Sequence, residues 1–462
     1  MLVESFSGIR GIYKKDLNED ITRKYAYAYS QTLKKDPKVV IGTDTRASAE
    51  PLKQAIFDIF KNIIDLEVAT TPMTELAVRE YKADGGIIIT ASHNEPEWNG
   101  FKFLDSDGAV LDPKKASEVI KNFHKIKDLK EEEFLDLIHK KDPTVHEIQK
   151  QHEDIKARYY NFIIKTIGKK HIEQIKKLNI KVLLDPNGGA GITNIDILKK
   201  INKNFIAINT KQGEFKRTIE PNESSLKSLK TKLNELNADF AAGFDCDADR
   251  VEILLKDGNM VSGQYVLALV VDQILEEQKN PESQTIAVND ATSYLVKEIA
   301  DKYKTKLVET EVGEINVVNA MVINNSPIGG EGSSAGAIIP SSRCRDGILT
   351  LLSILKLIAK RKKPLNEIIK DYPVYYTLKD KVSINPEKTA EIKKKIKQFY
   401  LKKGFRIQET GPTGGLKIIT KDAFLWFRQS KTEQGILRIM ADSKSKEKAE
   451  LLLKEGKTFI NT

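Results

Sequence analysis

The sequence predicts an α/β fold that contains three similar repeats, and two observations support this prediction. Short runs of β-branched and other apolar residues alternate with longer stretches of helical periodicity, which is typical of α/β layers. In addition, an apolar strand that ends in a polar turn occurs in three successive blocks, and a second polar loop follows each one about 40 to 60 residues later. The strand-and-turn segments are residues 39–46, 182–191 and 285–293, and the polar loops are residues 90–94, 245–250 and 329–334.

The individual elements follow from the same periodicity. We expect strands at residues 38–41, 86–89, 181–184, 240–243, 251–255 and 285–288. We expect helices at residues 23–34, 52–62, 149–167, 226–236, 265–277 and 347–360. The charged stretch 125–142 separates the first block from the second. A change of composition with two prolines at 360–375 predicts a boundary before a smaller C-terminal domain.

Length and composition indicate a soluble globular protein with several domains. At 462 residues the chain is too long for one ordinary core, and 40% hydrophobic with 30% charged residues is a globular composition. Its apolar runs are shorter than the roughly 20 residues of a membrane helix, so we expect no membrane partner. The first residues, MLVESFSGIRG, contain neither a basic region nor an apolar run, so we expect no signal peptide and a cytoplasmic location.

Cysteine content and charge argue against other classes of protein. The two cysteines, Cys246 and Cys344, lie far apart and in no metal-ligand spacing, which argues against a disulfide framework and a structural zinc site. The net charge of +10 comes from lysines spread along the whole chain, without a basic cluster interleaved with aromatic residues. We therefore expect no nucleic-acid partner. The charge fits a solvated surface best and is also compatible with a cleft that attracts anionic small molecules.

The most specific local motif is DCDADR at residues 245–250. In an extended loop, alternate residues project to the same side, so Asp245, Asp247 and Asp249 can converge on one point. Their mutual repulsion requires a cation, and oxygen ligands of this kind suit Mg²⁺. An EF-hand would need Gly and Glu where Arg250 and Lys256 stand, so the motif predicts a different metal loop. It directly follows an apolar strand, which is where ligands of α/β proteins bind.

A second chemical loop lies in residues 85–102 and contains Ser92 at the end of an apolar strand. A serine in this position is a candidate phosphoryl carrier, and His93, Asn94 and Lys102 lie near it to orient groups or transfer protons. The loop lacks the G-x-S-x-G pattern of esterases. A serine in a turn is usually only a turn residue, so this hypothesis depends on the metal loop being close.

Two further loops offer groups that suit a phosphorylated sugar. The glycine-rich loop 326–336 presents Glu331, whose carboxylate can accept hydrogen bonds from a pair of sugar hydroxyls. Residues 427–443 place Arg428, Ser430, Lys431 and Thr432 after an aromatic strand, and such cations and hydroxyls form a phosphate cradle. An ordinary glycine-rich turn and an ordinary polar hairpin are the alternatives for these two segments.

In this order and spacing, the four loops resemble those of the phosphohexomutase superfamily, which includes phosphoglucomutase, phosphomannomutase and phosphoglucosamine mutase. TASHN (90–94) resembles the phosphoserine loop, and DCDADR resembles the D-G-D-x-D-R metal loop with Cys246 in place of glycine. GGEGSS (329–334) is similar to the sugar-specificity loop, and RQSKTE (428–433) is similar to the phosphate loop. Shorter matches, such as SGIRG, DTR and RDG, extend the resemblance over essentially the whole chain.

The resemblance implies three similar α/β domains with mixed sheets and a smaller C-terminal α+β domain around a central cleft. The domains would be residues 1–145 with the phosphoserine loop, 146–256 with the metal loop, 257–370 with the sugar-recognition loop and 371–462 with the phosphate-binding loop. It implies an isomerase, an intramolecular phosphotransferase that interconverts hexose 1-phosphate and hexose 6-phosphate through a phosphoserine enzyme and a sugar bisphosphate. Mannose, glucose and glucosamine phosphate are alternatives for the substrate, and the assembly is a monomer or a small homo-oligomer.

The resemblance also implies roles for individual residues. Ser92 would carry the phosphoryl group and would join the aspartates 245, 247 and 249 in holding one Mg²⁺, with a hexose bisphosphate as activator and intermediate. The other catalytic residues would be Arg10, His93, Lys102 and Arg250. The substrate-binding residues would be Glu331, Ser333, Arg428, Ser430, Lys431 and Thr432.

Some residues depart from the family pattern, and two other functions stay open. Lys431 and Gln434 stand where the phosphate loop usually has a glycine or asparagine and a proline, and Ala335 stands where some members have a histidine. These departures concern substrate choice, and the altered phosphate loop motivates one alternative, a non-catalytic sugar-phosphate binding relative. The other alternative is a metal-dependent sugar phosphatase with Asp245 as the nucleophile. Asp249 weakens that alternative, because such enzymes normally have a threonine or valine there.

Overall fold

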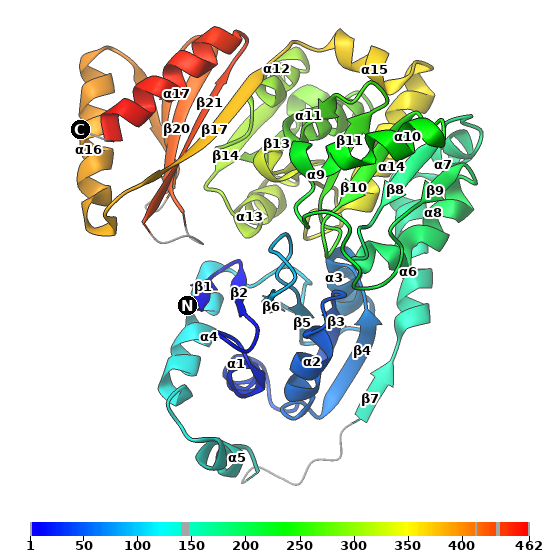
Figure 1. The fold of residues 1–462 in the computed structure, drawn as a ribbon, viewed down its shortest axis with the longest axis vertical. Helices are drawn as coiled ribbons and strands as arrows, with labels where there is room; N and C mark the ends of the chain where they lie inside the picture. The colour runs from blue at the N-terminus through cyan, green and yellow to red at the C-terminus, as the bar shows by residue number, and fades with distance from the viewer. Residues whose placement is uncertain (1, 140–146, 412–413, 431–434, 461–462) are drawn as a thin grey trace. The chain divides into compact units, whose positions relative to one another are not determined.

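The computed structural model describes residues 2–139, 147–411, 414–430 and 435–460. These described residues form two compact units. Unit 1 contains the residues up to 262 together with 338–360, and unit 2 contains residues 263–337 together with those from 361 onward. Figure 1 follows the chain by colour and labels its helices and strands. Across the described part of the chain, no helix is long and apolar enough to cross a membrane.

The first sheet of unit 1 is a mixed sheet built from the N-terminal part of the chain. In spatial order its strands are β1 (Val3–Ser5), β2 (Gly8–Ile12), β6 (Trp98–Leu104), β5 (Gly85–Ile89), β3 (Lys38–Thr43), β4 (Asn62–Val68) and β7 (Glu147–Lys150). The strands β5, β3, β4 and β7 are parallel to one another. The strand β6 is antiparallel to both of its neighbours, β5 and β2, and β1 pairs antiparallel with β2.

The second sheet of unit 1 is also mixed. Its strands follow the order β12 (Met260–Val261), β11 (Val251–Leu255), β10 (Phe240–Phe244), β8 (Val182–Asp185) and β9 (Phe205–Ala207). The strands β9, β8 and β10 are parallel, whereas β11 and β12 continue the sheet as an antiparallel meander.

A third sheet begins unit 2, and it repeats the order of the first two. Its strands are β14 (Lys306–Thr310), β13 (Thr285–Asn289), β15 (Gly329–Gly330) and β16 (Ala337–Ile338). Thus the order β4-β3-β5-β6 of the first sheet recurs as β9-β8-β10-β11 and as β14-β13-β15-β16. The strands β5 and β10 lead into the polar loops 90–94 and 245–250, and β15 forms the start of the polar loop 329–334. This common order confirms the prediction of three similar α/β repeats.

Helices follow the strands in both units. Those of unit 1 are α1 (Glu19–Ser30), α2 (Ala49–Phe57), α3 (Thr71–Glu80), α4 (Pro113–Ile126), α5 (Glu131–His139), α6 (His152–Ile167), α7 (Lys169–Lys176), α8 (Ile195–Ile201), α9 (Glu223–Leu226), α10 (Lys230–Glu235) and most of α14 (Gly347–Arg361). Those of unit 2 are α11 (Gly263–Leu275), α12 (Tyr294–Lys302), α13 (Glu314–Asn324), α15 (Leu365–Ile368), α16 (Thr389–Lys402) and α17 (Lys446–Ile460).

Helices cover both faces of the first sheet. The side chains of Ile87 and Ile89 belong to the same core cluster as buried residues of α1, α2 and α4. Because side chains alternate along a strand, Ile88 points to the other face, where α3 contacts β3 and β5. Tyr29 of α1 is fully buried in this core, and its hydroxyl donates to the carbonyl oxygen of Leu104 at 2.6 Å and accepts from the amide of Gly86 at 3.1 Å. The hydroxyl therefore links α1 to both strands that flank the serine loop.

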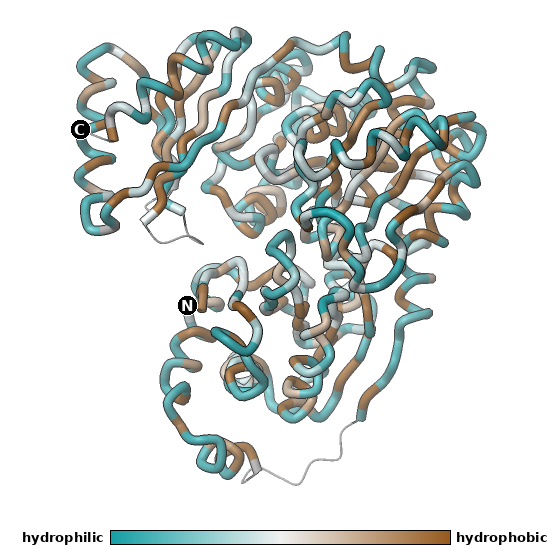
Figure 2. The backbone as a smooth tube through the Cα atoms, in the orientation of Figure 1, coloured by the Kyte–Doolittle hydropathy of each residue, from teal (hydrophilic) through white to brown (hydrophobic). Residues whose placement is uncertain are grey.

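The fourth sheet, in unit 2, is antiparallel throughout. Its strands follow the order β17 (Tyr376–Ser383), β21 (Ile436–Ser443), β20 (Ala423–Gln429), β19 (Leu416–Ile419) and β18 (Arg406–Glu409). Buried residues of α16 and α17 share one core cluster with these strands. In Figure 2 both helices alternate between hydrophobic and hydrophilic residues, which is the pattern of a helix with one buried face. This sheet confirms the smaller C-terminal α+β domain that we expected.

Within unit 2, buried polar contacts join the fourth sheet to the third repeat. Lys417 of β19 is 1% exposed, and its ammonium lies 2.5 Å from a carboxylate oxygen of Glu309 in β14. Asp442 of β21 is fully buried and accepts a hydrogen bond from the hydroxyl of Ser293 at 3.0 Å. Each contact satisfies a charge that would be costly to bury unpaired. The C-terminal domain therefore packs on the third repeat through one ion pair and one hydrogen bond to a buried carboxylate, as well as through an apolar cluster that joins Ala291 to Phe424 and Trp426.

The ends of several elements differ from the sequence-based prediction. The helix expected at residues 52–62 begins at Ala49 and ends at Phe57, and Asn62 already begins β4. The helix expected at 23–34 begins at Glu19, because the side chain of Asn18 accepts a hydrogen bond from the amide of Ile21 and caps it. The charged stretch 125–142 contains the end of α4 and all of α5. The apolar run after Phe57 fits a helix and a buried strand equally well, so periodicity alone misplaced that boundary.

Replacement of Tyr29 by phenylalanine tests whether its hydroxyl holds the strands that flank the serine loop. The change leaves the buried carbonyl of Leu104 and the amide of Gly86 without this partner, so we expect a loss of about 1–3 kcal/mol in the free energy of unfolding. Urea denaturation followed by circular dichroism measures it. The same change at Tyr376, which is 37% exposed, is the matched control. Equal midpoints for the Tyr29→Phe variant and the wild type would contradict the assigned role.

Candidate active site

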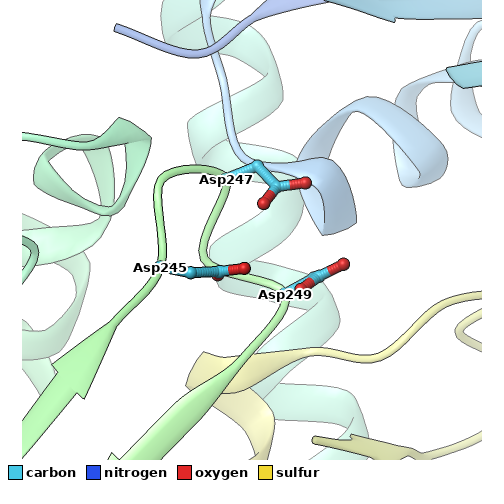
Figure 3. A group of neighbouring side chains, drawn as sticks. All are labelled: Asp245, Asp247 and Asp249. Carbon is cyan, nitrogen blue, oxygen red and sulfur yellow. The ribbon is translucent and has the colours of Figure 1, made fainter. Parts of the chain in front are cut away.

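The three aspartates of the metal motif converge at the end of β10 (Figure 3). Asp245 is 1% exposed, and Asp247 and Asp249 are fully buried. One carboxylate oxygen from each lies within 4.8 Å of the others. Ala248 adopts a left-handed conformation with φ of 54°, which turns the chain back toward β11 so that the third aspartate faces the first. The sequence prediction that these residues meet at one point is therefore confirmed.

The crowding of these carboxylates changes their protonation. Burial and the charges of the two neighbouring aspartates raise the pKa of Asp245 well above its ordinary value. At Asp249, burial also favours the neutral acid, but nearby cations outweigh it and hold the pKa far below its usual range. These cations are Arg345, Lys102 and Arg250. A cation is thus the group that stabilises this cluster of charges.

The donor set fits a divalent cation. Asp247 Oδ1 and Asp249 Oδ1 are buried, and neither has a hydrogen-bond partner among the described residues. A buried carboxylate oxygen without a partner is costly, so such atoms commonly mark a bound ion. All of the donors are carboxylate oxygens, which are the ligands of hard divalent cations. These aspartates therefore have the composition and spacing of a divalent metal site.

Ser92 lies beside this cluster. Ser92 is 1% exposed and adopts a left-handed conformation with φ of 53° in the loop that follows β5. The hydroxyl donates to Asp245 Oδ2 at 3.1 Å and lies 3.5 Å from His93 Nδ1, while the amide donates to the hydroxyl of Thr90 at 2.8 Å. Non-glycine residues seldom adopt this conformation, and it occurs where the surrounding structure fixes it. The serine loop and the metal loop, 153 residues apart in sequence, therefore meet.

A buried arginine that our site prediction did not include holds the serine loop. Arg46 is 2% exposed, and its guanidinium donates to the carbonyl oxygen of Ser92 at 2.9 Å and to that of Asn94. The carboxylate of Asp44 neutralises it. The signal in the sequence was the DTR motif at residues 44–46, which offers an acid and a guanidinium two residues apart. Arg46 fixes the backbone on which the nucleophilic hydroxyl is presented.

Lys102 of β6 lies within the acidic cluster. Its ammonium is 2.7 Å from Asp247 Oδ2 and 3.2 Å from Asp249 Oδ2, and it is 3.3 Å from the hydroxyl of Thr71. Thr71, at the start of α3, donates its hydroxyl to Asp247 Oδ2 at 2.6 Å and its amide to the carbonyl oxygen of the same aspartate at 3.0 Å. Thr71 was not among the predicted site residues. It orients the middle aspartate from a helix in another repeat.

Two predicted arginines and the predicted histidine surround the serine. Arg10 of β2 donates from Nη1 to the side-chain oxygen of Asn94 at 2.8 Å, and burial together with Arg250 lowers its pKa to about 10. The Nε atom of Arg250 lies 3.6 Å from carboxylate oxygens of both Asp245 and Asp249. Arg250 and burial, followed by Arg10, lower the pKa of His93 well below its ordinary value. This imidazole is therefore neutral at physiological pH, and the same burial and cations make it a weaker base than an ordinary histidine.

A third arginine, Arg345, also reaches the metal loop. It is 6% exposed, and its Nη2 atom donates to Asp249 Oδ2 at 3.0 Å. The residue lies 96 positions beyond its partner, in the RDG motif that precedes α14. In the sequence, this motif is one of the short matches that extend the resemblance. Nothing in the local sequence assigned the guanidinium to the aspartates.

The remaining predicted residues lie in unit 2. Glu331 is 4% exposed, and its Oε1 atom accepts from Asn289 Nδ2 at 3.0 Å and from the amide of Gly313 at 2.9 Å. The same amide group of Asn289 donates to the hydroxyl of Ser333 at 3.3 Å. Asn289, at the end of β13, therefore fixes the two side chains that we expected in the sugar loop. It was missed because a single asparagine after a strand carries no specific signal.

The predicted phosphate loop is described in part. Arg428 is 6% exposed and donates from Nη2 to the carbonyl oxygen of Val312 at 3.4 Å, and burial lowers its pKa. Its direct cross-strand partner is Arg438 of β21. Like charges opposite each other destabilise a sheet, and the carboxylate of Glu311, 3.9 Å from Arg428 Nη2, offsets part of this repulsion. Ser430 is 8% exposed and follows β20, whereas the predicted Lys431 and Thr432 lie outside the described residues.

Comparison with protein families agrees with this geometry. Residues 4–130, 157–258 and 262–375 match the models of alpha/beta/alpha domains I, II and III of phosphoglucomutase/phosphomannomutase. A phosphoglucomutase/phosphomannomutase of Thermococcus kodakarensis is 34% identical over 97% of this chain and 96% of its own length. A phosphoglucosamine/phosphogalactosamine mutase of Sulfurisphaera tokodaii is 29% identical over 98% of both chains.

Solved structures share the fold over the whole chain. A phosphoglucomutase/phosphomannomutase family protein of Burkholderia thailandensis superposes with a TM-score of 0.81 at 18% identity and covers 99% of this chain and 97% of its own. The parafusin phosphoglucomutase of Paramecium, in its open form, also gives 0.81 at 18% identity, with coverages of 99% and 94%. From its sequence relatives and its matched domains, the chain belongs to the phosphoglucomutase/phosphomannomutase family of sugar phosphate mutases, which are isomerases.

Proposed function

We propose that this protein interconverts a hexose 1-phosphate and a hexose 6-phosphate through a phosphorylated Ser92 and a sugar bisphosphate. The observation that carries the proposal is the position of the Ser92 hydroxyl, 3.1 Å from Asp245 in the buried aspartate cluster. This arrangement joins a nucleophile to a metal site that can stabilise phosphoryl transfer. The four predicted domains, at 1–145, 146–256, 257–370 and 371–462, would each contribute one of the loops.

The metal in this proposal is one Mg²⁺. Asp245, Asp247 and Asp249 would hold it together with a phosphate oxygen on Ser92. All of these donors are oxygens, and Mg²⁺ prefers oxygen ligands and the company of phosphate groups. When bound, it supplies positive charge to the oxygens of the phosphoryl group in the transition state.

The reaction would proceed in two transfers. In the first, the bond from phosphorus to Ser92 breaks and a new bond forms to a free hydroxyl of the hexose monophosphate, which gives a bisphosphate. The proton of that hydroxyl ends on the Ser92 oxygen that the phosphoryl group leaves; His93, whose Nδ1 atom lies 3.5 Å from that oxygen, would relay the proton, and Lys102 would assist the transfer. In the second, the bond from the other phosphorus to the sugar oxygen breaks, a bond from that phosphorus to Ser92 forms, and the proton of Ser92 passes to the released sugar oxygen. Arg10 and Arg250 would stabilise the group in transfer.

The residues of unit 2 would hold the part of the substrate that does not react. Glu331 and Ser333 would bind sugar hydroxyls, supported by the hydrogen bonds through which Asn289 fixes both side chains. Arg428 and Ser430 would bind the second phosphate, and the opposed guanidinium of Arg438 supports an anion there. The same role for Lys431 and Thr432 rests on the sequence motif.

Assays with several hexose phosphates would identify the substrate. Glucose 1-phosphate and mannose 1-phosphate come first, because the relative from Thermococcus kodakarensis is named phosphoglucomutase/phosphomannomutase. Glucosamine 6-phosphate follows, because the Sulfurisphaera tokodaii relative is a phosphoglucosamine/phosphogalactosamine mutase. Each assay includes the corresponding bisphosphate as activator. Failure of all three substrates to turn over in the presence of Mg²⁺ would favour a sugar-phosphate binding protein.

Replacement of Ser92 by alanine removes the proposed phosphoryl carrier. We expect kcat to fall by about a thousandfold or more in bisphosphate-primed assays, as is usual when a covalent nucleophile is lost. Mass spectrometry of the wild type should find phosphate on the peptide that contains Ser92. The exposed Ser106 in the same unit gives the matched control, and Ser106→Ala should keep full activity. Phosphate on Asp245 instead of Ser92 would favour the phosphatase alternative.

Replacement of Asp245 by asparagine separates metal binding from folding. Because the pKa of Asp245 is raised, its ionised form destabilises the metal-free fold as pH rises through that pKa. The metal-free Asp245→Asn variant should therefore melt no lower than the wild type at pH 8, with a smaller difference at pH 5. Mg²⁺ should raise the Tm of the wild type but not of the variant. The control is Asp257→Asn at the exposed β11–β12 turn, and an equal Mg²⁺ response in both variants would refute the assignment.

Replacement of Arg428 by alanine tests the second phosphate site. A contact present in both the ground state and the transition state contributes mainly to binding, so we expect KM to rise roughly 10- to 100-fold. A smaller decrease in kcat should accompany it, because the distal phosphate also aligns the reacting end. Steady-state kinetics measures both constants, with the exposed Arg406→Ala in the same sheet as control. Unchanged constants would mean that another group holds this phosphate.

A further inference from the structure

A buried glutamate on α3 connects this helix to the segment that carries Arg345. Glu75 is 1% exposed, and its Oε1 atom accepts from the backbone amide of Arg343 at 2.5 Å and from Arg79 Nη1 at 2.5 Å. The thiol of Cys344 lies 3.6 Å from Oε2. A carboxylate that is buried this completely must be hydrogen-bonded, and here one partner, Arg79, is on the same helix while Arg343 lies 268 residues away in sequence.

That segment, residues 343–346, runs against the metal loop. Arg345 donates to Asp249 Oδ2 at 3.0 Å. The next-but-one residue, Gly347, donates its amide to the carbonyl oxygen of Ala248 at 3.2 Å, and a Cβ atom there would lie 2.8 Å from the carbonyl oxygen of Arg250. Backbone and side chain of the segment therefore both contact the loop that holds the aspartates.

The segment is fixed at its two ends by different groups. At the C-terminal end, Asp346 accepts the amides of Ile348 and Leu349 at the start of α14, at 3.0 and 2.9 Å, and the hydroxyl of Tyr159 at 2.8 Å. At the N-terminal end, the carboxylate of Glu75 accepts the backbone amide of Arg343. The guanidinium that reaches the aspartates lies between these two anchors.

We propose that Glu75 is a positioning residue for the metal site: by holding the backbone at Arg343, it places the guanidinium of Arg345 on Asp249 and thereby strengthens binding of a divalent cation. Groups that hydrogen-bond to a ligating carboxylate orient it, and their loss typically weakens metal binding about 10- to 100-fold. The inference depends on the proposed function for the use of the metal in catalysis. The contact to Asp249 does not depend on which sugar phosphate is the substrate.

Glu75 also makes this effect sensitive to pH. Burial raises its pKa to about 7, against the opposing effect of Arg79. Near neutrality the side chain is therefore partly protonated, and a protonated carboxyl is a weaker acceptor for the amide of Arg343. The charged and titratable groups around it come from each element packed against it: Arg79 on α3, Asp107 in the turn before α4, Tyr159 on α6, and Arg343, Cys344 and Asp346 in segment 343–346.

The test measures binding of Mn²⁺ alone, by isothermal titration calorimetry, because this readout needs no turnover. We expect Glu75→Ala and Arg345→Ala each to weaken Mn²⁺ binding about tenfold at pH 8. The double variant should be no weaker than Arg345→Ala, because two residues that act through one contact are not additive. Glu80→Gln, on the exposed end of the same helix, should bind Mn²⁺ as the wild type does.

Glu75→Gln separates positioning from a purely structural role. Glutamine keeps one acceptor, so binding should weaken less than in Glu75→Ala, by about threefold at pH 8, and the difference from wild type should shrink toward pH 6. The ionised form of a group with a raised pKa destabilises the fold at high pH, so Glu75→Gln should have a Tm at pH 8 no lower than that of the wild type. A structural role would instead lower Tm and leave Mn²⁺ affinity unchanged.

Several results would overturn the proposal. The first is an unchanged Mn²⁺ affinity in the Glu75 variants. The second is a double variant that binds Mn²⁺ about a hundredfold more weakly than the wild type, which would mean that the two residues act independently. If Glu75→Ala does not fold, the comparison of Glu75→Gln with Arg345→Ala decides. Absence of mutase turnover in a wild type that binds Mn²⁺ would refute the proposed function and leave the role of Glu75 to be judged by affinity.

Discussion

The structure of unit 1 depends on the repulsion among three carboxylates buried within 4.8 Å of one another. Cations from three separate segments compensate this repulsion: Lys102 in β6, Arg250 in the metal loop, and Arg345 before α14. Each cation is useful only when its own segment is folded, so the loop becomes stable when the first repeat, the second repeat and residues 343–346 are all in place. The same condition brings Ser92 to the aspartates. The site is therefore complete only when these parts of unit 1 have folded, because the cations that neutralise the aspartates come from all of them.

The repeated order of strands explains why the chemical groups occur at such regular intervals. In each of the first three sheets, the third strand of the shared order lies at a polar loop, as β5 does before Ser92 and β10 before Asp245. The carboxyl ends of parallel strands are where α/β proteins bind ligands. Left-handed backbone at Ser92 and at Ala248 then turns each loop sharply, so that short loops present their groups at the strand ends.

Features set by local spacing could be predicted from the sequence, whereas features set by distant contacts could not. The aspartates 245, 247 and 249 were found because alternate positions of one loop carry the signal. Thr71 and Arg345 were missed because their contacts to the metal loop span 176 and 96 residues, and a single threonine or arginine carries no such information. The end of α2 at Phe57 was misplaced because the apolar residues after it suit a helix and a strand equally. The strands themselves were predicted well, since β11 and the start of β13 match the expected ranges.

The buried ion pair between Lys417 and Glu309 limits how the C-terminal domain can evolve. A gene fusion that exchanged residues 372–462 for a domain without a cation at the position of Lys417 would leave the half-buried carboxylate of Glu309 without this partner and would lower stability. In the same way, the hydrogen bond between Ser293 and the buried carboxylate of Asp442 would be lost if the new domain had no acceptor at the position of Asp442. Recombination at this junction would therefore succeed only with compensating changes in the third repeat. The two parts of unit 2 are expected to have been inherited together, even though each has its own sheet.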